Sequence, residues 1–245
     1  MSRELIEITK EILANRYPNA SVIFLAGSLV RGEGTPFSDL DLVVIFNQLP
    51  NAYRESFCYR GRLVEAFVHD PETLNYFLYN HDRPSGFPVI AQMVVEGIEV
   101  PASGDLSQSL KQLAASMIEM GPPKLSEDEV HRLRYTVTSL VDDIRHPRNK
   151  EELVASGTDM YGALANCYFR TNNLWSAQGK SIPWVLKKAN PDLYLQYCNS
   201  FDDLFRTGRT DKVIALAEEI LKPCGGLLFD GYRSDAPAAS RKPIV

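Results

Sequence analysis

Apolar residues recur with two different periods in the first hundred residues of the chain. Residues 3–16 carry aliphatic side chains three or four positions apart, which predicts an amphipathic helix that ends at Tyr17-Pro18-Asn19. Short apolar runs follow, bounded by polar or turn-forming residues, and these predict buried strands. The strands are expected over residues 22–25, 40–46 and 63–68, with a last edge strand at 98–100.

A helix is also predicted directly after residue 70, and one segment beyond it is ambiguous. Asp70 followed by Pro71 is typical of a helix start, because Asp caps free backbone N–H groups and Pro suits the first helical position. Residues 89–95 are apolar almost throughout. The pattern there is compatible with a short buried helix and with a strand.

After Pro101 the apolar pattern becomes helical only. Gly121-Pro122-Pro123 interrupts it, and Ser126 followed by Glu129 is a capping box that opens a long helix. Helices are predicted over residues 105–120, from 127 onward, over 151–178, from 191 onward and over 211–221.

These patterns predict the fold class and the domain boundaries. We expect an α+β N-terminal domain, a mixed sheet flanked by helices, followed by an all-α helical bundle. The N-terminal domain is predicted over residues 1–102 and the helical domain over 103–232. Residues 233–245 are polar and rich in Pro and Ala, so we expect a loosely ordered tail.

Composition narrows the classes of partner. The net charge of −5 and the pI near 5.5 argue against a broad basic surface, so nucleic acid is not expected as a partner. No apolar run approaches the roughly 18 residues of a membrane helix. The N-terminus also lacks the apolar core of a signal peptide, and we therefore expect a cytoplasmic protein. The four cysteines form no C-x-x-C pair, which favours free thiols over zinc or disulfides.

The most informative segment lies between two predicted strands. Gly27-Ser28 ends the first apolar run, and Asp39-Leu40-Asp41 opens the next one eleven residues later. Side chains alternate along a strand, so Asp39 and Asp41 point the same way while Leu40 faces the core. Two adjacent carboxylates raise each other's pKa unless a cation neutralises them, and Mg²⁺ prefers such oxygen ligands. The pair therefore predicts a metal site, where two ions roughly 4 Å apart would clamp phosphate oxygens.

The residues before this pair suit a phosphate. Gly27 lets the backbone approach a phosphate closely, and Ser28 adds a hydroxyl donor. Arg31 is the first cation that follows and could hold a terminal phosphate. We expect Gly27, Ser28 and Arg31 to bind a phosphate group.

A third carboxylate is expected on a neighbouring strand. Glu65 lies in the apolar run 63–68, where a charged side chain needs a partner. It could complete the metal site or take the proton from an attacking hydroxyl. Asp70 is the competing candidate, although its position before Pro71 favours helix capping. His69 and His81 are the histidines that could approach the same site.

The combination of Gly-Ser, ten residues and Asp-x-Asp resembles the signature of the polymerase-beta-like nucleotidyltransferase superfamily. A small mixed domain followed by helices resembles its bacterial aminoglycoside (antibiotic) nucleotidyltransferase branch. The resemblance implies that Gly27 and Ser28 hold a triphosphate and that Asp39 and Asp41 bind Mg²⁺. It also implies that Glu65 is a third metal ligand, the base, or both. Relatives often use a lysine of the helical domain on the phosphates, and Lys180 and Lys187 are the two candidates here.

The expected activity is transfer of a nucleoside monophosphate, AMP from ATP, to a hydroxyl of a small molecule. Two Mg²⁺ ions are the expected cofactors, pyrophosphate is the leaving group, and an aminoglycoside-like antibiotic is the expected type of acceptor. Two alternatives stay open: a protein hydroxyl as the acceptor, and a non-catalytic nucleotide-binding module of the same fold. The sequence indicates neither the acceptor's identity nor an oligomeric state.

Overall fold

The structure, a computed structural model, describes residues 3–237 and 240–241. Contacts divide the chain into two compact units, of which the first ends at Pro123 and the second begins at Lys124. The sequence placed this boundary after residue 102, but the helix over 105–119 packs on the first unit. Part of the predicted tail, residues 238–239 and 242–245, lies outside the described residues.

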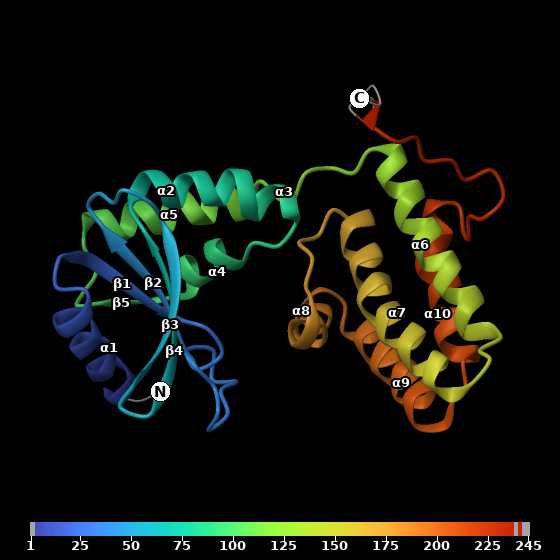
Figure 1. The fold of residues 1–245 in the computed structure, drawn as a ribbon, viewed down its shortest axis with the longest axis horizontal. Helices are drawn as coiled ribbons and strands as arrows, with labels where there is room; N and C mark the ends of the chain where they lie inside the picture. Colours follow the sequence, from blue (N-terminus) through green and yellow to red (C-terminus); the bar gives the residue numbers. More distant parts are fainter. Residues whose placement is uncertain (1–2, 238–239, 242–245) are drawn as a thin grey trace. The chain divides into compact units, whose positions relative to one another are not determined.

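The first unit is a five-stranded mixed sheet with helices on both faces (Figure 1). The strands are β1 (Ala20–Ala26), β2 (Leu40–Phe46), β3 (Tyr53–Tyr59), β4 (Arg62–His69) and β5 (Ile98–Val100), in the order β3-β4-β2-β1-β5. The helices are α1 (Arg3–Arg16), α2 (Pro71–Phe77), a π-helical turn (Leu78–Asp82), α3 (Arg83–Ser85), α4 (Val89–Glu96) and α5 (Asp105–Glu119). This arrangement, with the helical second unit, confirms the predicted fold class.

The pairing of the strands follows from one hairpin that the sequence analysis did not predict. Strand β3 alternates exposed with half-buried residues, and it turns into β4 through Arg60 and Gly61. Both turn residues have positive φ angles, as two-residue hairpins with right-handed twist require. Strand β3 runs in the direction opposite to β2, and the hairpin reverses the chain again, so β4 runs parallel to β2. Every other pair in the sheet is antiparallel.

Apolar side chains on one face of this sheet form a core with α1. Leu40 and Leu42 of β2 are fully buried there, and they alternate with Asp41, which faces the other way. Helix α4 contacts β1 and β2. The segment 89–95, which the sequence left open between helix and strand, is therefore a helix.

Helix α2 begins as the sequence predicts, with Asp70 as its N-cap. The Asp70 carboxylate accepts the N–H and the hydroxyl of Thr73, both at 2.8 Å, and the N–H of Leu49 at 2.8 Å. Burial alone would raise the pKa of Asp70, but these hydrogen bonds lower it below its ordinary value. Asp70 is thus occupied by backbone capping.

Replacing this cap should destabilise the first unit. Asp70→Ala leaves the half-buried N–H groups of Thr73 and Leu49 without their acceptor, and we expect a loss of about 2 kcal/mol of unfolding free energy. Urea unfolding followed by far-UV circular dichroism measures this loss. Tryptophan fluorescence would not report on the first unit, because both tryptophans lie in the second. Glu72→Ala, an exposed acid in the same helical turn, is the control and should change little. Equal effects of the two substitutions would contradict the capping role.

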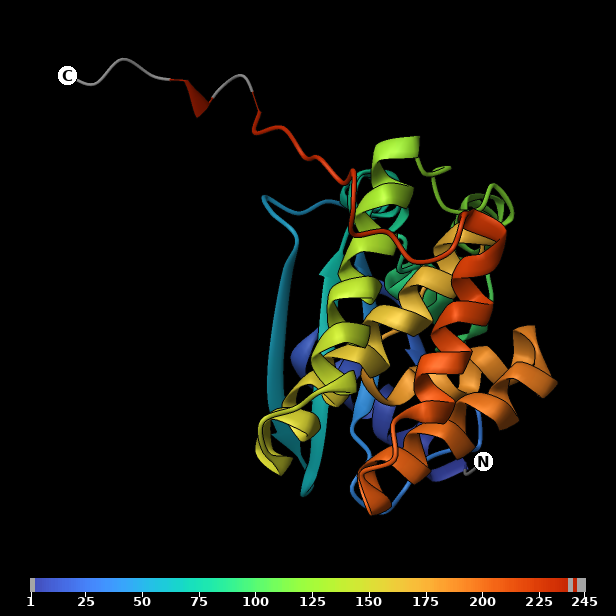
Figure 2. The ribbon, with the colours of Figure 1, turned by 90° about the vertical axis from the view of Figure 1, so that its right-hand side faces the viewer.

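Among its described residues, the second unit contains helices joined by loops and no strand (Figures 1 and 2). The predicted helix over 151–178 ends earlier, at Thr171, and a short helix over 182–189 was not predicted. Arg134 donates to the carbonyls of Gly225 and Gly226, and the N–H of Leu228 donates to Thr138. The segment that follows the helix over 211–221 therefore lies against the helix over 127–145 (Figure 2). The helices are α6 (Glu127–Arg145), α7 (Lys150–Thr171), α8 (Ile182–Ala189), α9 (Pro191–Thr207) and α10 (Asp211–Leu221).

Among the described residues, no helix combines the length and the apolar character that crossing a membrane requires.

Candidate active site

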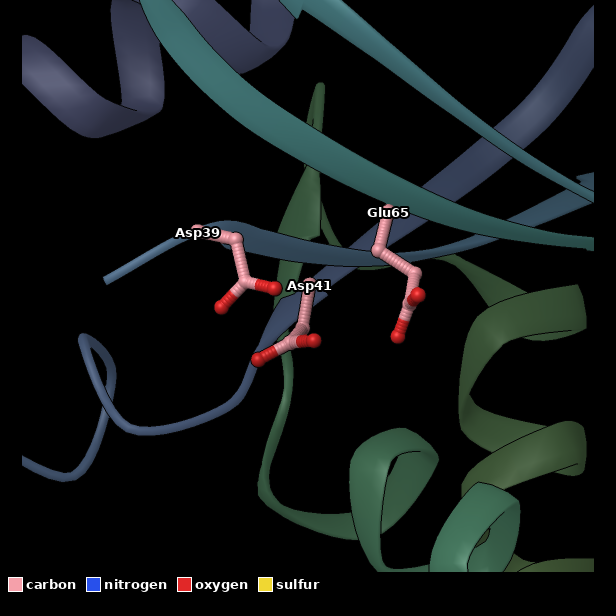
Figure 3. A group of neighbouring side chains, drawn as sticks. All are labelled: Asp39, Asp41 and Glu65. Atoms are coloured by element: carbon pink, nitrogen blue, oxygen red, sulfur yellow. The ribbon is translucent and has the colours of Figure 1, made fainter. Parts of the chain in front are cut away.

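Three carboxylates meet on the face of the sheet opposite α1. Asp39, Asp41 and Glu65 each offer an oxygen, and these oxygens lie within 4.8 Å of one another. All three side chains are half-buried and point into the same space (Figure 3). The structure thus brings together the three carboxylates that the sequence singled out as metal ligands.

Strand register explains why the three groups meet. Asp41 of β2 pairs with Glu65 of β4 in the parallel ladder, so their side chains stand on the same face of the sheet. Asp39 precedes Asp41 by two positions and shares that face (Figure 3). Their neighbours Leu40 and Ala66 are fully buried on the opposite face. Apolar anchoring on one side therefore fixes the carboxylates on the other.

Gly27 lies directly against this carboxylate group. Its φ of +79° belongs to the left-handed region, and its carbonyl accepts the N–H groups of Val30 (3.1 Å) and Arg31 (3.3 Å) in a tight turn. A Cβ atom at this position would lie 2.7 Å from Cγ of Asp41 and closer still to Oδ2. Both the backbone conformation and the space beside Asp41 therefore require glycine here.

Hydroxyl groups hold the loop between Gly27 and Asp39. Ser28 Oγ donates to Ser38 Oγ at 3.3 Å, and Ser38 Oγ accepts the N–H of Thr35 at 2.9 Å. Ser28, predicted as a phosphate ligand, is thus placed beside the residue that precedes Asp39. The described loop between Gly27 and Asp39 forms turns and no helix.

Arg31 lies in the same turn and binds acidic partners. Its guanidinium is 3.0 Å from Glu33 and 3.6 Å from Glu96 at the end of α4. These ion pairs hold the side chain beside the Gly27 turn, where the sequence analysis expected a cation.

Glu65 has a partner that the sequence analysis missed. Arg54 of β3 donates from Nε and Nη2 to Oε1 of Glu65, and its guanidinium carbon lies 5.0 Å from the centre of the Phe67 ring. Strand β3 forms a hairpin with β4, the strand that carries Glu65. The alternating pattern of residues 53–59 before Arg60-Gly61 is the feature of the sequence that could have predicted it. Arg54 forms an ion pair with Glu65, while its own side chain stays 61% exposed.

Comparison with known proteins assigns this part of the chain to a family. Residues 6–83, which include the Gly27 turn and all three carboxylates, match the family described as nucleotidyltransferase domain. Residues 6–83 form a nucleotidyltransferase domain. This finding confirms the polymerase-beta-like superfamily that the motif predicted, and nucleotidyl transfer is the general activity of the domain.

Two further comparisons add little to this assignment. A crystal structure of a nucleotidyltransferase-like protein from Exiguobacterium sibiricum 255-15 is 14% identical in sequence, with a TM-score of 0.43. The match covers 89% of this chain and 75% of that protein's chain. No curated protein matches the chain.

The nucleotidyltransferase domain offers a donor set that fits a divalent metal. Its three carboxylates supply hard oxygen ligands close enough together for a shared cation, which is the chemistry that Mg²⁺ prefers. Without a cation, their negative charges would repel one another at this separation. Asp70, the competing candidate, is committed to capping α2 and lies outside this group.

The two candidate lysines lie outside the nucleotidyltransferase domain. Lys180 belongs to a 3₁₀ turn and Lys187 to α8 of the second unit, and both side chains are exposed. Lys187 Nζ lies 5.8 Å from the centre of the Tyr194 ring. A role for either lysine on the phosphates stays a prediction.

His69 of the nucleotidyltransferase domain is a buried, neutral imidazole. Only 3% of the residue is exposed, its Nδ1 lacks a hydrogen-bond partner, and the Phe77 ring packs edge-on at 5.0 Å. Burial lowers the pKa of His69 to about 4, although the charge of Asp70 opposes the shift. Asp82 nearby shows the reverse, since burial raises its pKa to about 6.

This shift predicts a pH-dependent stability difference. As the pH falls from 6.5 to 4, unfolded protein takes up a proton on His69 before folded protein does, so folding loses stability through that interval. His69→Phe removes this loss, and we expect the variant to gain about 3 kcal/mol relative to the unsubstituted protein between pH 7 and pH 4. Asp82 is present in both proteins, so its contribution to the pH dependence of stability cancels when the two proteins are compared.

Urea unfolding at pH 7, 5.5 and 4, followed by far-UV circular dichroism, checks this expectation. His81→Phe is the control, because His81 is exposed and stacks on the same Phe77 ring. A stability difference that stays constant with pH in His69→Phe would contradict a neutral His69.

Proposed function

We propose that this protein transfers AMP from ATP to a hydroxyl group of a small molecule in a Mg²⁺-dependent reaction that releases pyrophosphate. One observation carries the proposal: three carboxylate oxygens within 4.8 Å of one another, directly beside the Gly27 turn. The nucleotidyltransferase domain at residues 6–83 supports the reaction type.

The Gly27 turn would hold the donor nucleotide. Its close approach to Asp41 would bring backbone and phosphate oxygens next to the metal ligands, and Ser28 would donate its hydroxyl to a β- or γ-phosphate oxygen. Arg31 would exchange its contacts with acidic side chains for the terminal phosphate. Lys180 or Lys187 of the second unit would add a further positive charge.

Asp39 and Asp41 would hold the metal, with Glu65 as a third ligand, the base, or both. When bound, Mg²⁺ neutralises negative charge on the triphosphate and polarises the α-phosphorus. The acceptor oxygen forms a bond to the α-phosphorus, and the bond from that phosphorus to the bridging oxygen breaks. Pyrophosphate leaves with the electron pair, and the Glu65 carboxylate takes the proton of the hydroxyl. Most of the acceleration would come from positioning and charge neutralisation.

Labelled ATP tests the proposal directly. The protein is incubated with [α-³²P]ATP and Mg²⁺ together with aminoglycosides, lincosamides, aromatic alcohols or bulk protein, and the label is followed by chromatography. We expect label on a small-molecule hydroxyl, an equal amount of pyrophosphate, and loss of both in EDTA.

The other outcomes separate the alternatives. Label on protein alone would favour a protein hydroxyl as acceptor. Nucleotide binding without any transfer of label would favour a non-catalytic module of the same fold. Transfer that persists in EDTA would contradict the metal-dependent mechanism.

A further inference from the structure

A pocket lies on the same face of the sheet as the three carboxylates. Its volume is about 410 Å³, a size typical of small-molecule sites. It is lined by the ends of β3 and β4, by α2 and the π-helical turn, and by the start of α4. The lining residues used below are Arg54, Phe67, His69, Phe77, Asp82 and Val89.

Strand order places this pocket beyond Glu65, on the side opposite the Gly27 turn. Gly27 follows β1, Asp41 lies on β2, Glu65 on β4 and Arg54 on β3, and these strands are neighbours in that sequence. Arg54 binds Glu65 and also lines the pocket. The order across the sheet is therefore the Gly27 turn, the metal ligands, Glu65, Arg54 and the pocket.

In-line displacement requires this order. The attacking oxygen and the leaving oxygen stand on opposite sides of the α-phosphorus. With the leaving pyrophosphate on the Gly27 side, the attacking hydroxyl approaches from the Glu65 side. The pocket next to Glu65 is therefore the place for the acceptor rather than for the nucleotide.

The wall of the pocket is chiefly aromatic and aliphatic. Phe67 and Phe77 supply rings, and the buried His69 is uncharged with an unpaired Nδ1. Asp82 is 6% exposed, and its Oδ2 accepts the N–H of Ala91 at 2.9 Å, so this carboxylate serves the backbone of α4.

The lining holds one arginine, Arg54, and one carboxylate, Asp82, which is buried and bound to the backbone of α4. Outside the lining, Glu65 is paired with Arg54. Among the described residues of the lining, Asp82 is the one carboxylate, and only 6% of it is exposed to an ammonium group. A polycationic sugar would lose solvation here without gaining an ion pair.

We infer that this pocket binds the acceptor and selects a molecule whose hydroxyl adjoins an aromatic or apolar ring and which carries no positive charge there. The inference rests on the proposed function, since it assigns the acceptor of that reaction. It departs from the aminoglycoside-like acceptor expected from the sequence. The ring would pack on Phe67 and Phe77, and Arg54 would receive an acidic or polar substituent.

Probe binding tests the pocket without relying on catalysis. The anionic aromatic dye 8-anilinonaphthalene-1-sulfonate is titrated by fluorescence against the full chain in EDTA without nucleotide. Val89→Trp, at the 49% exposed rim, should fill the pocket and weaken the dye by about tenfold or more. Val154→Trp, a 42% exposed helical valine of the second unit, is the matched control and should leave the affinity unchanged.

A second variant covers the case in which Val89→Trp fails to fold. Arg54→Gln removes the only arginine of the lining at an exposed position and should weaken the dye by about tenfold. Kanamycin, a polycation, should not displace the dye. The inference is overturned by no saturable dye binding, by equal affinities in Val89→Trp and Val154→Trp, or by displacement with kanamycin.

The transfer assay separates acceptor from nucleotide. With any labelled acceptor, Val89→Trp should raise the KM of the acceptor by about tenfold and leave the KM of ATP unchanged. A raised KM of ATP instead would place the nucleotide base in the pocket and overturn the inference. Dye binding at this pocket in a protein that transfers no label would contradict the proposed function alone.

Discussion

Asp41→Asn is expected to lower nucleotidyl transfer by about 10³-fold or more while the fold stays intact. Asp41 lies between Asp39 and Glu65 in the carboxylate group, so its replacement removes one of three charges that would hold the metal. Asn has the same shape, and the strand around it is anchored by buried Leu40 and Leu42. Asp39→Asn should behave in the same way.

Thermal unfolding gives this prediction a second readout. Removing one of three crowded carboxylates should leave the metal-free variant as stable as the unsubstituted protein or slightly more stable, because repulsion is relieved. We expect Mg²⁺ to raise the melting temperature of the unsubstituted protein but not that of the variant. Asp105→Asn, at an exposed acid of the same unit, is the control and should retain both transfer and the Mg²⁺ effect. Full activity in Asp41→Asn would refute the assignment of the site.

Gly27→Ala is the second substitution with a large expected effect. A methyl group at this position would overlap Asp41 and would also impose a φ of +79° on an L residue. The turn must shift, and Asp41 or the phosphate-holding backbone shifts with it. We expect transfer to fall by about 100-fold or more, because displacements near 1 Å carry such losses.

Gly32→Ala isolates the cause of that loss. Gly32 lies in the same loop with a nearly equal φ of +75°, but a Cβ there would meet nothing within 4 Å. Both substitutions should cost about 1–2 kcal/mol of stability through backbone strain. Only Gly27→Ala should lose transfer from [α-³²P]ATP. Similar losses of activity in both variants would show that loop strain, rather than the approach of Gly27 to Asp41, is responsible.

The helices of the first unit illustrate what local sequence can predict. Asp70-Pro71 predicts the start of α2, and the structure places the carboxylate of Asp70 on the N–H of Thr73. Helix α1 likewise has the predicted bounds. Capping and helical periodicity depend on residues a few positions apart, so the local sequence is enough to predict where these helices lie.

Strand β3 illustrates what such reasoning missed. Its side chains alternate between exposed and half-buried, so the strand contains no apolar run. The segment before it, residues 47–52, contains no apolar run either. The strand is stable because β4 pairs with it along its full length. Arg54, the partner of Glu65, was missed for the same reason.

The sequence by itself determined the donor half of the proposed site. Gly27, Ser28, Asp39 and Asp41 lie within fifteen residues, and the two-residue period of a strand places the two aspartates on one face.

Tertiary structure decided which distant groups join them. The parallel pairing of β2 with β4 brings Glu65 to Asp41, while capping keeps Asp70 away. The hairpin then brings Arg54 to Glu65 and forms one wall of the pocket. Strand order and register depend on burial and pairing across the whole sheet, which no short stretch of sequence contains.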